Sequence, residues 1–166
     1  MRALVVYESM WGNTRAVAEA VGATLAGRME VRVADVGEVP AGEVAEYDLV
    51  VAGAPTHAFS LSRASTRQAA LEQGAPESSS TYGLREWIAA LPAPTDTRVA
   101  CFDTRVERVR NLPGSAARKA ARLLRRAGWD VVARQSFYVS DTAGPLLPAE
   151  VDRASAWAGT LVGARV

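Results

Sequence analysis

The sequence predicts an α/β fold, a doubly wound five-stranded parallel sheet with strand order 2-1-3-4-5. Apolar runs alternate with amphipathic stretches along the chain, which is typical of strands joined by helices. Crossovers of this kind are right-handed and place helices on both faces of the sheet. A polar turn suited to phosphate follows the first apolar run, which favours this strand order. The length suits one domain, and we expect it to span residues 1–166.

Each expected strand is an apolar run or an alternation of apolar and polar residues. Asp48–Gly53 is nearly continuous in apolar residues, as a central parallel strand would be. Met29–Ala34 alternates, which indicates a half-exposed strand near an edge of the sheet. In chain order, the expected strands are Arg2–Tyr7, Met29–Ala34, Asp48–Gly53, Arg98–Phe102 and Trp129–Ala133, the last extended past a bend by Phe137–Val139.

The helices are expected where apolar residues recur on one helical face. Asn13–Ala26 has apolar residues at every fourth position, Val17, Val21 and Leu25. Ser115 is expected to cap a later helix, and Gly74–Ser80 is expected to be an exposed loop. The other helices are a short one at Gly42–Tyr47, a piece at Arg63–Leu71, one with Leu84, Trp87, Ile88 and Leu91 inward, one with Ala117, Ala120, Ala121 and Leu124 inward, and a last one with Val151, Ala154, Ala158 and Leu161 inward.

Composition excludes several classes of protein. Apolar residues make up 49% of the chain and charged residues 22%, which is globular rather than disordered. No apolar run approaches the roughly 20 residues needed to span a bilayer, and a strand at the N-terminus leaves no signal peptide. The single cysteine, Cys101, excludes an intrachain disulfide, and we expect it to be a buried, inert thiol. We therefore expect a cytoplasmic protein without a membrane segment or a metal site.

The turn Ser9–Thr14 joins the first strand to the first helix, and this junction is a natural site for an anion. Backbone N–H groups at a helix N-terminus and the helix dipole bind phosphate without a cation. Ser9, Asn13 and Thr14 add hydroxyl and amide donors. The alternative is that Asn13 or Thr14 only caps the helix. The sequence contains neither a P-loop motif nor a dinucleotide G-x-G-x-x-G after the strand, which makes both nucleotide folds poor candidates.

The segment Ser9-Met10-Trp11-Gly12-Asn13-Thr14 resembles the S-M-[YW]-G-N-T phosphate loop of the flavodoxin family. The resemblance implies a flavodoxin-like fold and FMN as cofactor. It also implies that the FMN phosphate is held by this loop, with side chains of Ser9, Asn13 and Thr14 and backbone N–H groups from Met10 to Thr14. The expected contacts of this loop are Ser9, Met10, Trp11, Gly12, Asn13 and Thr14.

Two further loops extend the resemblance to the flavodoxin family. Gly53-Ala54-Pro55-Thr56 is similar to the family's G-x-P-T, which an aromatic that stacks on the flavin usually follows; here His57, Ala58 and Phe59 follow. The resemblance implies that His57, Phe59 or Trp11 covers the ring, although a satisfied polar residue is the alternative for His57. Asp103-Thr104-Arg105 is expected to be the third loop, whose backbone N–H groups would meet the flavin, although a surface turn is the alternative for Arg105. Pro55, Thr56, His57, Ala58, Phe59, Asp103, Thr104 and Arg105 complete the expected cofactor site.

Charge is unevenly distributed along the chain. Residues 105–134 hold nine basic side chains against Glu107 and Asp130, so the remainder is net acidic. This segment is either a solvated helix face or a docking surface, near Arg105–Arg126, for an acidic redox partner protein. A nucleic-acid role is less favoured because no aromatic residues interleave the basic ones.

The resemblance to the flavodoxin family implies a redox protein whose cofactor carries the chemistry, so we assign no catalytic residue to the chain itself. An electron carrier or a small flavin oxidoreductase fits best. An NAD(P)H:quinone reductase of the same fold is the first alternative, and a non-redox binding module that has lost its flavin is the second. The only histidine and the absence of a nucleophile elbow exclude a Ser-His-Asp site.

Overall fold

The computed structural model describes residues 1–76 and 81–163, and its strands form one parallel sheet. The strand order is β2-β1-β3-β4-β5, so the predicted order is confirmed. Every neighbouring pair of strands is parallel. The strands are β1 (Arg2–Tyr7), β2 (Glu30–Asp35), β3 (Leu49–Pro55), β4 (Arg98–Val106) and β5 (Asp130–Val139).

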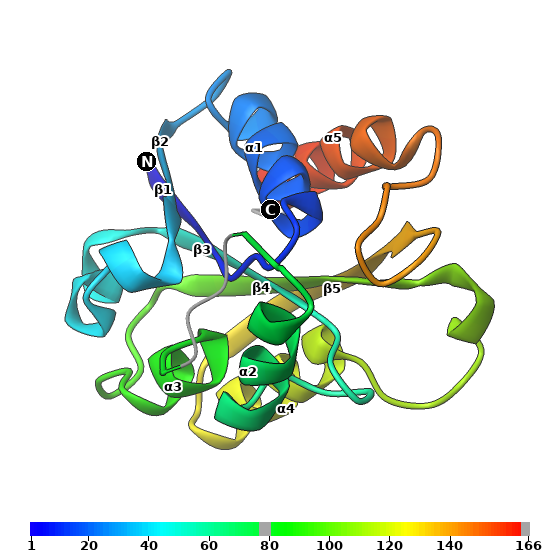
Figure 1. Ribbon diagram of the computed structural model, residues 1–166. Coiled ribbons are helices and arrows are strands. Elements are labelled where there is room, and N and C mark those ends of the chain that lie inside the picture. The colour runs from blue at the N-terminus through cyan, green and yellow to red at the C-terminus, as the bar shows by residue number, and fades with distance from the viewer. Residues whose placement is uncertain (77–80, 164–166) are drawn as a thin grey trace.

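Helices cover both faces of this sheet (Figure 1). The α-helices are α1 (Asn13–Leu25), α2 (Ala64–Glu72), α3 (Leu84–Ala89), α4 (Ala116–Arg126) and α5 (Glu150–Val162). Short 3₁₀ turns lie at Val36–Glu38, Ala41–Glu46 and Glu107–Val109. Helices α1 and α5 cover one face, and α2, α3 and α4 lie on the other. Because all five strands are parallel, they end at the same edge of the sheet, where a ligand site is expected in such folds.

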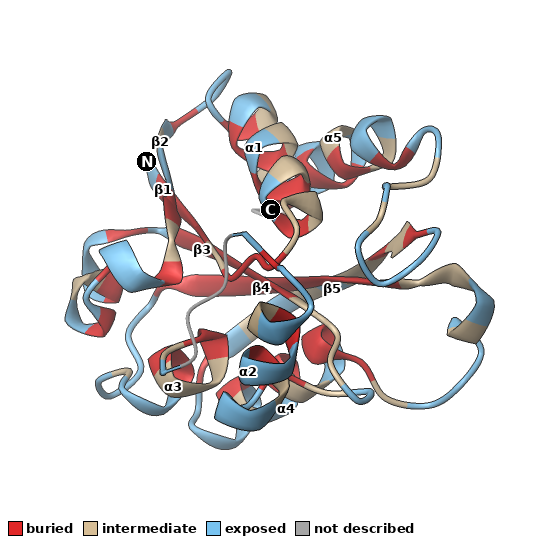
Figure 2. Ribbon diagram, viewed as in Figure 1, coloured by how far each residue is buried: buried red, intermediate tan, exposed pale blue. Residues whose placement is uncertain are grey.

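The core on the α1 and α5 side is built around three aromatic rings. Phe102, Phe137 and Trp157 meet edge to face, with centroids 5.9 to 6.2 Å apart. A Cβ atom at Gly53 would lie 2.0 Å from the Phe102 ring, so only glycine fits there. Figure 2 shows the buried centre of the sheet between the helices. The glycine that begins the G-x-P-T segment is thus explained by packing on the neighbouring strand.

The core on the other side is packed closely through small side chains. Helix α4 turns its alanines and Leu124 inward, as predicted, and its N-cap Ser115 accepts a hydrogen bond from the Arg118 N–H at 3.3 Å. The buried Trp87 of α3 donates its indole N–H to the Val39 carbonyl at 2.9 Å. Cys101 is fully buried in β4, where burial raises the pKa of the thiol to about 12. The expected burial of this thiol is confirmed.

The structure corrects the expected loop at Asp103-Thr104-Arg105, because these residues belong to β4. They pair with β5 as far as Val106 opposite Val139, and on the other side Pro55 lies opposite Thr104. The strand is longer than expected because β5 continues through Phe137–Val139 and supplies partners to its end. The register shifts between Val99 and Ala100, where β5 carries one extra residue.

Two smaller expectations also need correction. Val151 was expected to point inward but is 46% exposed, because Glu150 takes the inward position and its carboxylate accepts a hydrogen bond from the Tyr138 N–H at 2.7 Å. Leu91 lies beyond the end of α3 yet still packs against the core. Of the expected loop Gly74–Ser80, residues 77–80 lie outside the described part of the chain, and residues 74–76 form a turn and loop after α2.

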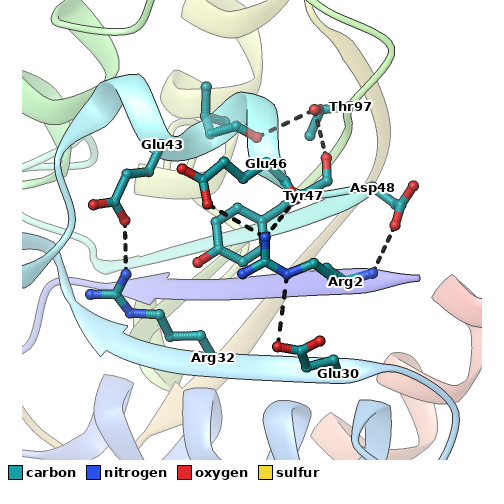
Figure 3. A network of polar contacts seen from close by, with 9 residues as sticks. Arg2, Glu30, Arg32, Glu43, Glu46, Tyr47, Asp48 and Thr97 are labelled. Carbon is teal, nitrogen blue, oxygen red and sulfur yellow. Dashed lines mark hydrogen bonds and ion pairs between the residues drawn. The ribbon is translucent and has the colours of Figure 1, made fainter.

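A network of charged side chains closes the other end of the sheet, where the strands begin (Figure 3). The Arg2 N–H donates to the Asp48 carboxylate at 2.7 Å, and Arg32 pairs with Glu43 at 2.8 Å. Arg2, Arg32 and Asp48 are exposed or nearly so, and exposed ion pairs contribute about 0–1 kcal/mol each. This network ties β1 and β2 to the segment before β3, far from the edge where the strands end.

Candidate functional site

A cleft lies where β1, β3 and β4 end, at the edge of the sheet that the topology predicts for a ligand. It brings together Met10, Trp11, Asn13, Thr14, Pro55, Thr56, His57, Thr104 and Arg105 from the residues predicted by sequence. Val106, Val139 and Thr142 complete it and were not predicted. Val139 and Thr142 lie at the end of β5, so applying the strand-end rule to the fifth strand would have found them.

The N-terminus of α1 opens onto this cleft. Gly12 is the N-cap residue with φ of 90°, a left-handed conformation that favours glycine, and no side chain caps the helix. The Ser9 hydroxyl instead accepts a hydrogen bond from the Gly12 N–H at 3.1 Å, which closes the turn. The alternative that Asn13 or Thr14 serves only as a cap is therefore wrong, because both residues lie inside the helix.

Thr14 and Asn13 each connect this turn to a distant part of the chain. The hydroxyls of Thr14 and Thr104 are 2.8 Å apart, and both residues are buried. The Asn13 amide donates to the Ala143 carbonyl at 3.2 Å, which ties the turn to the loop after β5. A Cβ atom at Gly144 would lie 2.6 Å from the Asn13 Oδ1, so the loop approaches Asn13 closely only because glycine is there.

Met10 and Trp11 occupy different environments in the turn. The Met10 side chain is buried in a small cluster with Ala70 and Ala75, and the half-buried Trp11 packs against that cluster. Both residues line the cleft. Met10 therefore anchors the turn on the α2 side, while the Trp11 indole is a candidate for contact with a planar ring.

The segment after β3 makes a strained turn. His57 and Ser60 exchange two backbone hydrogen bonds of 2.9 Å, and between them Ala58 and Phe59 have φ of 47° and 59°. Left-handed conformations cost non-glycine residues about 1–2 kcal/mol each, and such strain gathers at functional sites. The turn directs His57 into the cleft, whereas neither Ala58 nor Phe59 lines it. Of the three candidates to cover the ring, Trp11 and His57 line the cleft and Phe59 does not.

His57 is held mainly uncharged at neutral pH by its surroundings. Burial lowers the pKa of His57, and the positive charge of Arg67 lowers it further. The side chain is half-buried rather than enclosed. A neutral imidazole beside the cleft can take up a proton when negative charge appears next to it.

Two predicted residues, Thr56 and Asp103, hold the N-terminus of α4, and a third, Arg105, holds the loop that leads to it. The Thr56 hydroxyl accepts from the Ala116 N–H at 3.1 Å, and the Asp103 carboxylate accepts from the Ala117 N–H at 2.9 Å. Asp103 is fully buried, and burial raises its pKa. Arg105 donates from one guanidinium nitrogen to two carbonyls of the loop after β4. Asp103 is not among the residues that line the cleft, so its visible role is to fix α4.

A buried polar network lies directly behind the turn, and sequence reasoning missed it. Glu8 accepts hydrogen bonds from the Ser62 hydroxyl at 2.6 Å and the Leu84 N–H at 2.7 Å. Arg67 donates to Ser62 at 2.9 Å and pairs with Glu86. Burial raises the pKa of Glu8, which the hydrogen bonds and Arg67 partly offset. The one sequence signal that could have revealed this network is Glu8, an acidic residue directly before the Ser9–Thr14 turn.

The cleft fits the phosphate and ring of FMN. Its donors are the α1 N-terminus and the side chains of Asn13 and Thr14, which need no cation to hold a phosphate. Trp11, His57 and Val106 offer flat or apolar surfaces. Within residues 1–76 and 81–163, no group of three or more metal-ligating side chains could hold a metal ion. No described helix is both long and apolar enough to cross a membrane.

Comparisons with known proteins identify the family and agree with the fold. The family model described as Flavodoxin matches residues 5–102. Among solved structures, the chain is similar to flavodoxin 1 from Bacillus cereus, with TM-score 0.71, 14% identity and all of both chains covered. It is also similar to a flavodoxin from the domain Archaea, with TM-score 0.67, 20% identity and coverage of 98% of this chain and 97% of that one. At these identities the structures show the fold alone. The search of curated proteins found no match.

Proposed function

This chain belongs to the flavodoxin family and binds FMN, and from that premise we propose that it works as an electron carrier or small flavin oxidoreductase. The observation that carries the proposal is the cleft itself, where the uncapped N-terminus of α1 and the side chains of Trp11 and His57 meet. We also propose that residues 1–166 act as one domain, since the described helices all pack on one sheet.

In this proposal each part of the cleft has a separate task. FMN supplies the one- and two-electron chemistry when it is bound. Asn13, Thr14 and the backbone N–H groups of the turn hold the phosphate, and Ser9 keeps the turn closed through Gly12. Trp11 and His57 cover the ring and limit its contact with water. The charge and orientation of these groups then tune the redox potential.

The visible spectrum and the choice of electron donor test this proposal. We expect the purified protein to be yellow and to accept electrons from a reduced redox protein while remaining inert toward NAD(P)H. A yellow protein that oxidises NADPH with a quinone would instead favour the reductase. A protein that neither carries nor binds added FMN would contradict the proposal and favour a non-redox binding module.

We expect His57 to make the redox potential depend on pH. Reduction adds negative charge beside His57, which raises the pKa of the imidazole, so a proton is taken up with the electrons. The midpoint potential should therefore fall as pH rises between the oxidised-state and the reduced-state pKa. Because burial and Arg67 lower the pKa, this window begins below the ordinary value of 6.5.

The control for the flavin's own titration is His57→Leu, which keeps an apolar cover of similar reach and removes the imidazole proton. The measurement is the midpoint potential as a function of pH for both proteins with FMN bound. Part of the slope should vanish in the variant. Superimposable curves would show that His57 does not sense the charge on the ring.

The redox partner is proposed to be an acidic protein that docks near Arg105–Arg126. Arg118, Arg122, Arg125 and Arg126 of α4 are exposed, and α4 contains no acidic residue. Charge of one sign steers an oppositely charged partner and is screened by salt. We expect electron transfer to an acidic redox protein to slow as ionic strength rises, and more weakly so in Arg122→Gln. A rate independent of salt would contradict this docking surface.

A further inference from the structure

A second hollow lies beside the cleft and is lined by the loop that joins β4 to α4, by α4 and by β5. We call it the basic hollow, because four arginines line it: Arg105, Arg110, Arg118 and Arg134. Among the described residues, its lining includes no acidic side chain. It holds about 380 Å³ of free space, which is within the range of small-molecule pockets. The remaining lining residues are Asn111, Leu112, Pro113, Gly114, Ser115 and Ser136.

Arg105 is held rigidly and lacks a full set of partners. It is only 9% exposed, and one of its guanidinium nitrogens donates to the carbonyls of Val109 at 2.9 Å and Leu112 at 3.2 Å. Its buried Nε has no hydrogen-bond partner in residues 1–76 and 81–163. The Asp103 carboxylate interacts electrostatically with Arg105, but no hydrogen bond joins the two side chains among the described residues, so an anion in the hollow would further stabilise the guanidinium.

The acidic groups near the basic hollow leave most of its charge uncompensated. Asp103 is buried and interacts electrostatically with Arg105, so it compensates part of that charge, while its carboxylate accepts a hydrogen bond from the Ala117 N–H on α4. Glu107 pairs with Arg110 at 3.1 Å, and this exposed pair can reopen. No ion pair joins Arg118 or Arg134 to an acidic side chain in the part of the chain that the structure describes.

The donors around the basic hollow indicate the chemical class of its ligand. Guanidinium groups match the oxygens of phosphate in a two-pronged geometry, and the amide of Asn111 is a further donor. The Ser136 side chain is already hydrogen-bonded to Asp103. The N-terminus of α4 adds little, because side chains already accept from its first N–H groups. Recognition of charge therefore falls on the arginine side chains.

We propose that the basic hollow binds a phosphate-bearing small molecule beside the FMN cleft. Arg105 lines both the cleft and the hollow, so a ligand anchored by its phosphate here lies next to the redox site. The proposal that the hollow binds phosphate rests only on the residues that line the hollow. Only the further statement that this ligand lies beside a bound flavin rests on the proposed function.

The test measures the binding of inorganic phosphate and of NADP⁺ to the FMN-loaded protein by titration calorimetry at constant ionic strength. FMN keeps its own phosphate site filled during the titration. We expect Arg118→Gln and Arg134→Gln together to weaken both ligands tenfold or more. Arg126→Gln is the matched control for Arg118→Gln alone, because each removes one positive charge from α4, and it should change either affinity by less than twofold since Arg126 lies outside the hollow.

Each outcome decides the proposal. If NADP⁺ binds much more tightly than phosphate, the ligand is a nucleotide; if the two bind alike, it is a simpler phosphate compound, and both results support the hollow. The proposal would be overturned if the hollow variants and Arg126→Gln bound phosphate and NADP⁺ with equal affinity. It would also be overturned if both ligands bound only at the high concentrations at which an adventitious ion binds. Salt-sensitive binding of an acidic peptide without binding of either phosphate ligand would also overturn it in favour of protein docking. Failure of the unmodified protein to bind FMN would defeat the proposed function, and the hollow would then be judged by the difference in phosphate affinity between the hollow variants and Arg126→Gln.

Discussion

Replacing Asn13 with aspartate is expected to lower the affinity for FMN about a hundredfold while leaving helix α1 intact, although it removes the hydrogen bond from the Asn13 amide to the Ala143 carbonyl. The substitution places a negative charge in the turn proposed to hold the phosphate, and like charges in close contact cost several kcal/mol, of which about 1.4 kcal/mol corresponds to each factor of ten. A negative charge at the N-terminus of α1 is favourable for the helix itself. The same change should therefore weaken cofactor binding without weakening the helix.

The measurement is FMN affinity by quenching of flavin fluorescence, together with the thermal midpoint of the protein without FMN. Gln68→Glu is the matched control, because it makes the same change of amide to carboxylate on the exposed face of α2. We expect the control to bind FMN normally. Unchanged affinity in Asn13→Asp would remove this turn from phosphate binding. Thr14→Asp tests the same turn at a buried position, where a charge also lowers the free energy of unfolding more.

Replacing Arg67 with methionine is expected to lower the free energy of unfolding by about 3–5 kcal/mol, because it leaves a buried acidic group without its cation. Arg67 is 1% exposed and joins Ser62 and Glu86 to the Glu8 network. Its positive charge lowers the pKa of Glu8, so its removal raises that pKa further above the ordinary value of 4.5. The folded variant then retains a proton that the unfolded chain releases.

This difference in proton binding gives the loss a definite dependence on pH. Above pH 4.5 the unfolded state binds fewer protons than the folded state, so stability falls as pH rises toward the folded-state pKa of Glu8. The loss in Arg67→Met should be larger at pH 8 than at pH 5, measured by urea unfolding of both proteins. Arg28→Met, on the exposed surface, should change stability by less than about 0.5 kcal/mol. An equal loss at both pH values would show that Glu8 is not the group left unpaired.

Local patterns in the sequence were sufficient to predict the order of the strands and the position of the candidate cleft. Strands and helices follow from the spacing of apolar residues, and the position of a cleft at the ends of parallel strands follows from topology. The Ser9–Thr14 turn and His57 could be recognised because each motif is continuous in the chain and sits directly after a strand. The flavodoxin family and its FMN cofactor follow from the same residues.

Tertiary contacts alone decided where several side chains point. Asp103, Thr104 and Arg105 are strand residues because β5 continues beside them, and alternation along β4 then sends Thr104 to Thr14 and Asp103 to α4. The partners of Glu8 lie 54 and 76 residues away in the chain, so no local pattern could reveal that it is buried. The basic hollow arises in the same way, because α4 and β5 bring Arg118 and Arg134 to Arg105 only once the sheet is assembled. The type and approximate place of each element depend on neighbouring residues, whereas the length of a strand and the charge and burial of a side chain depend on groups that folding brings from elsewhere in the chain.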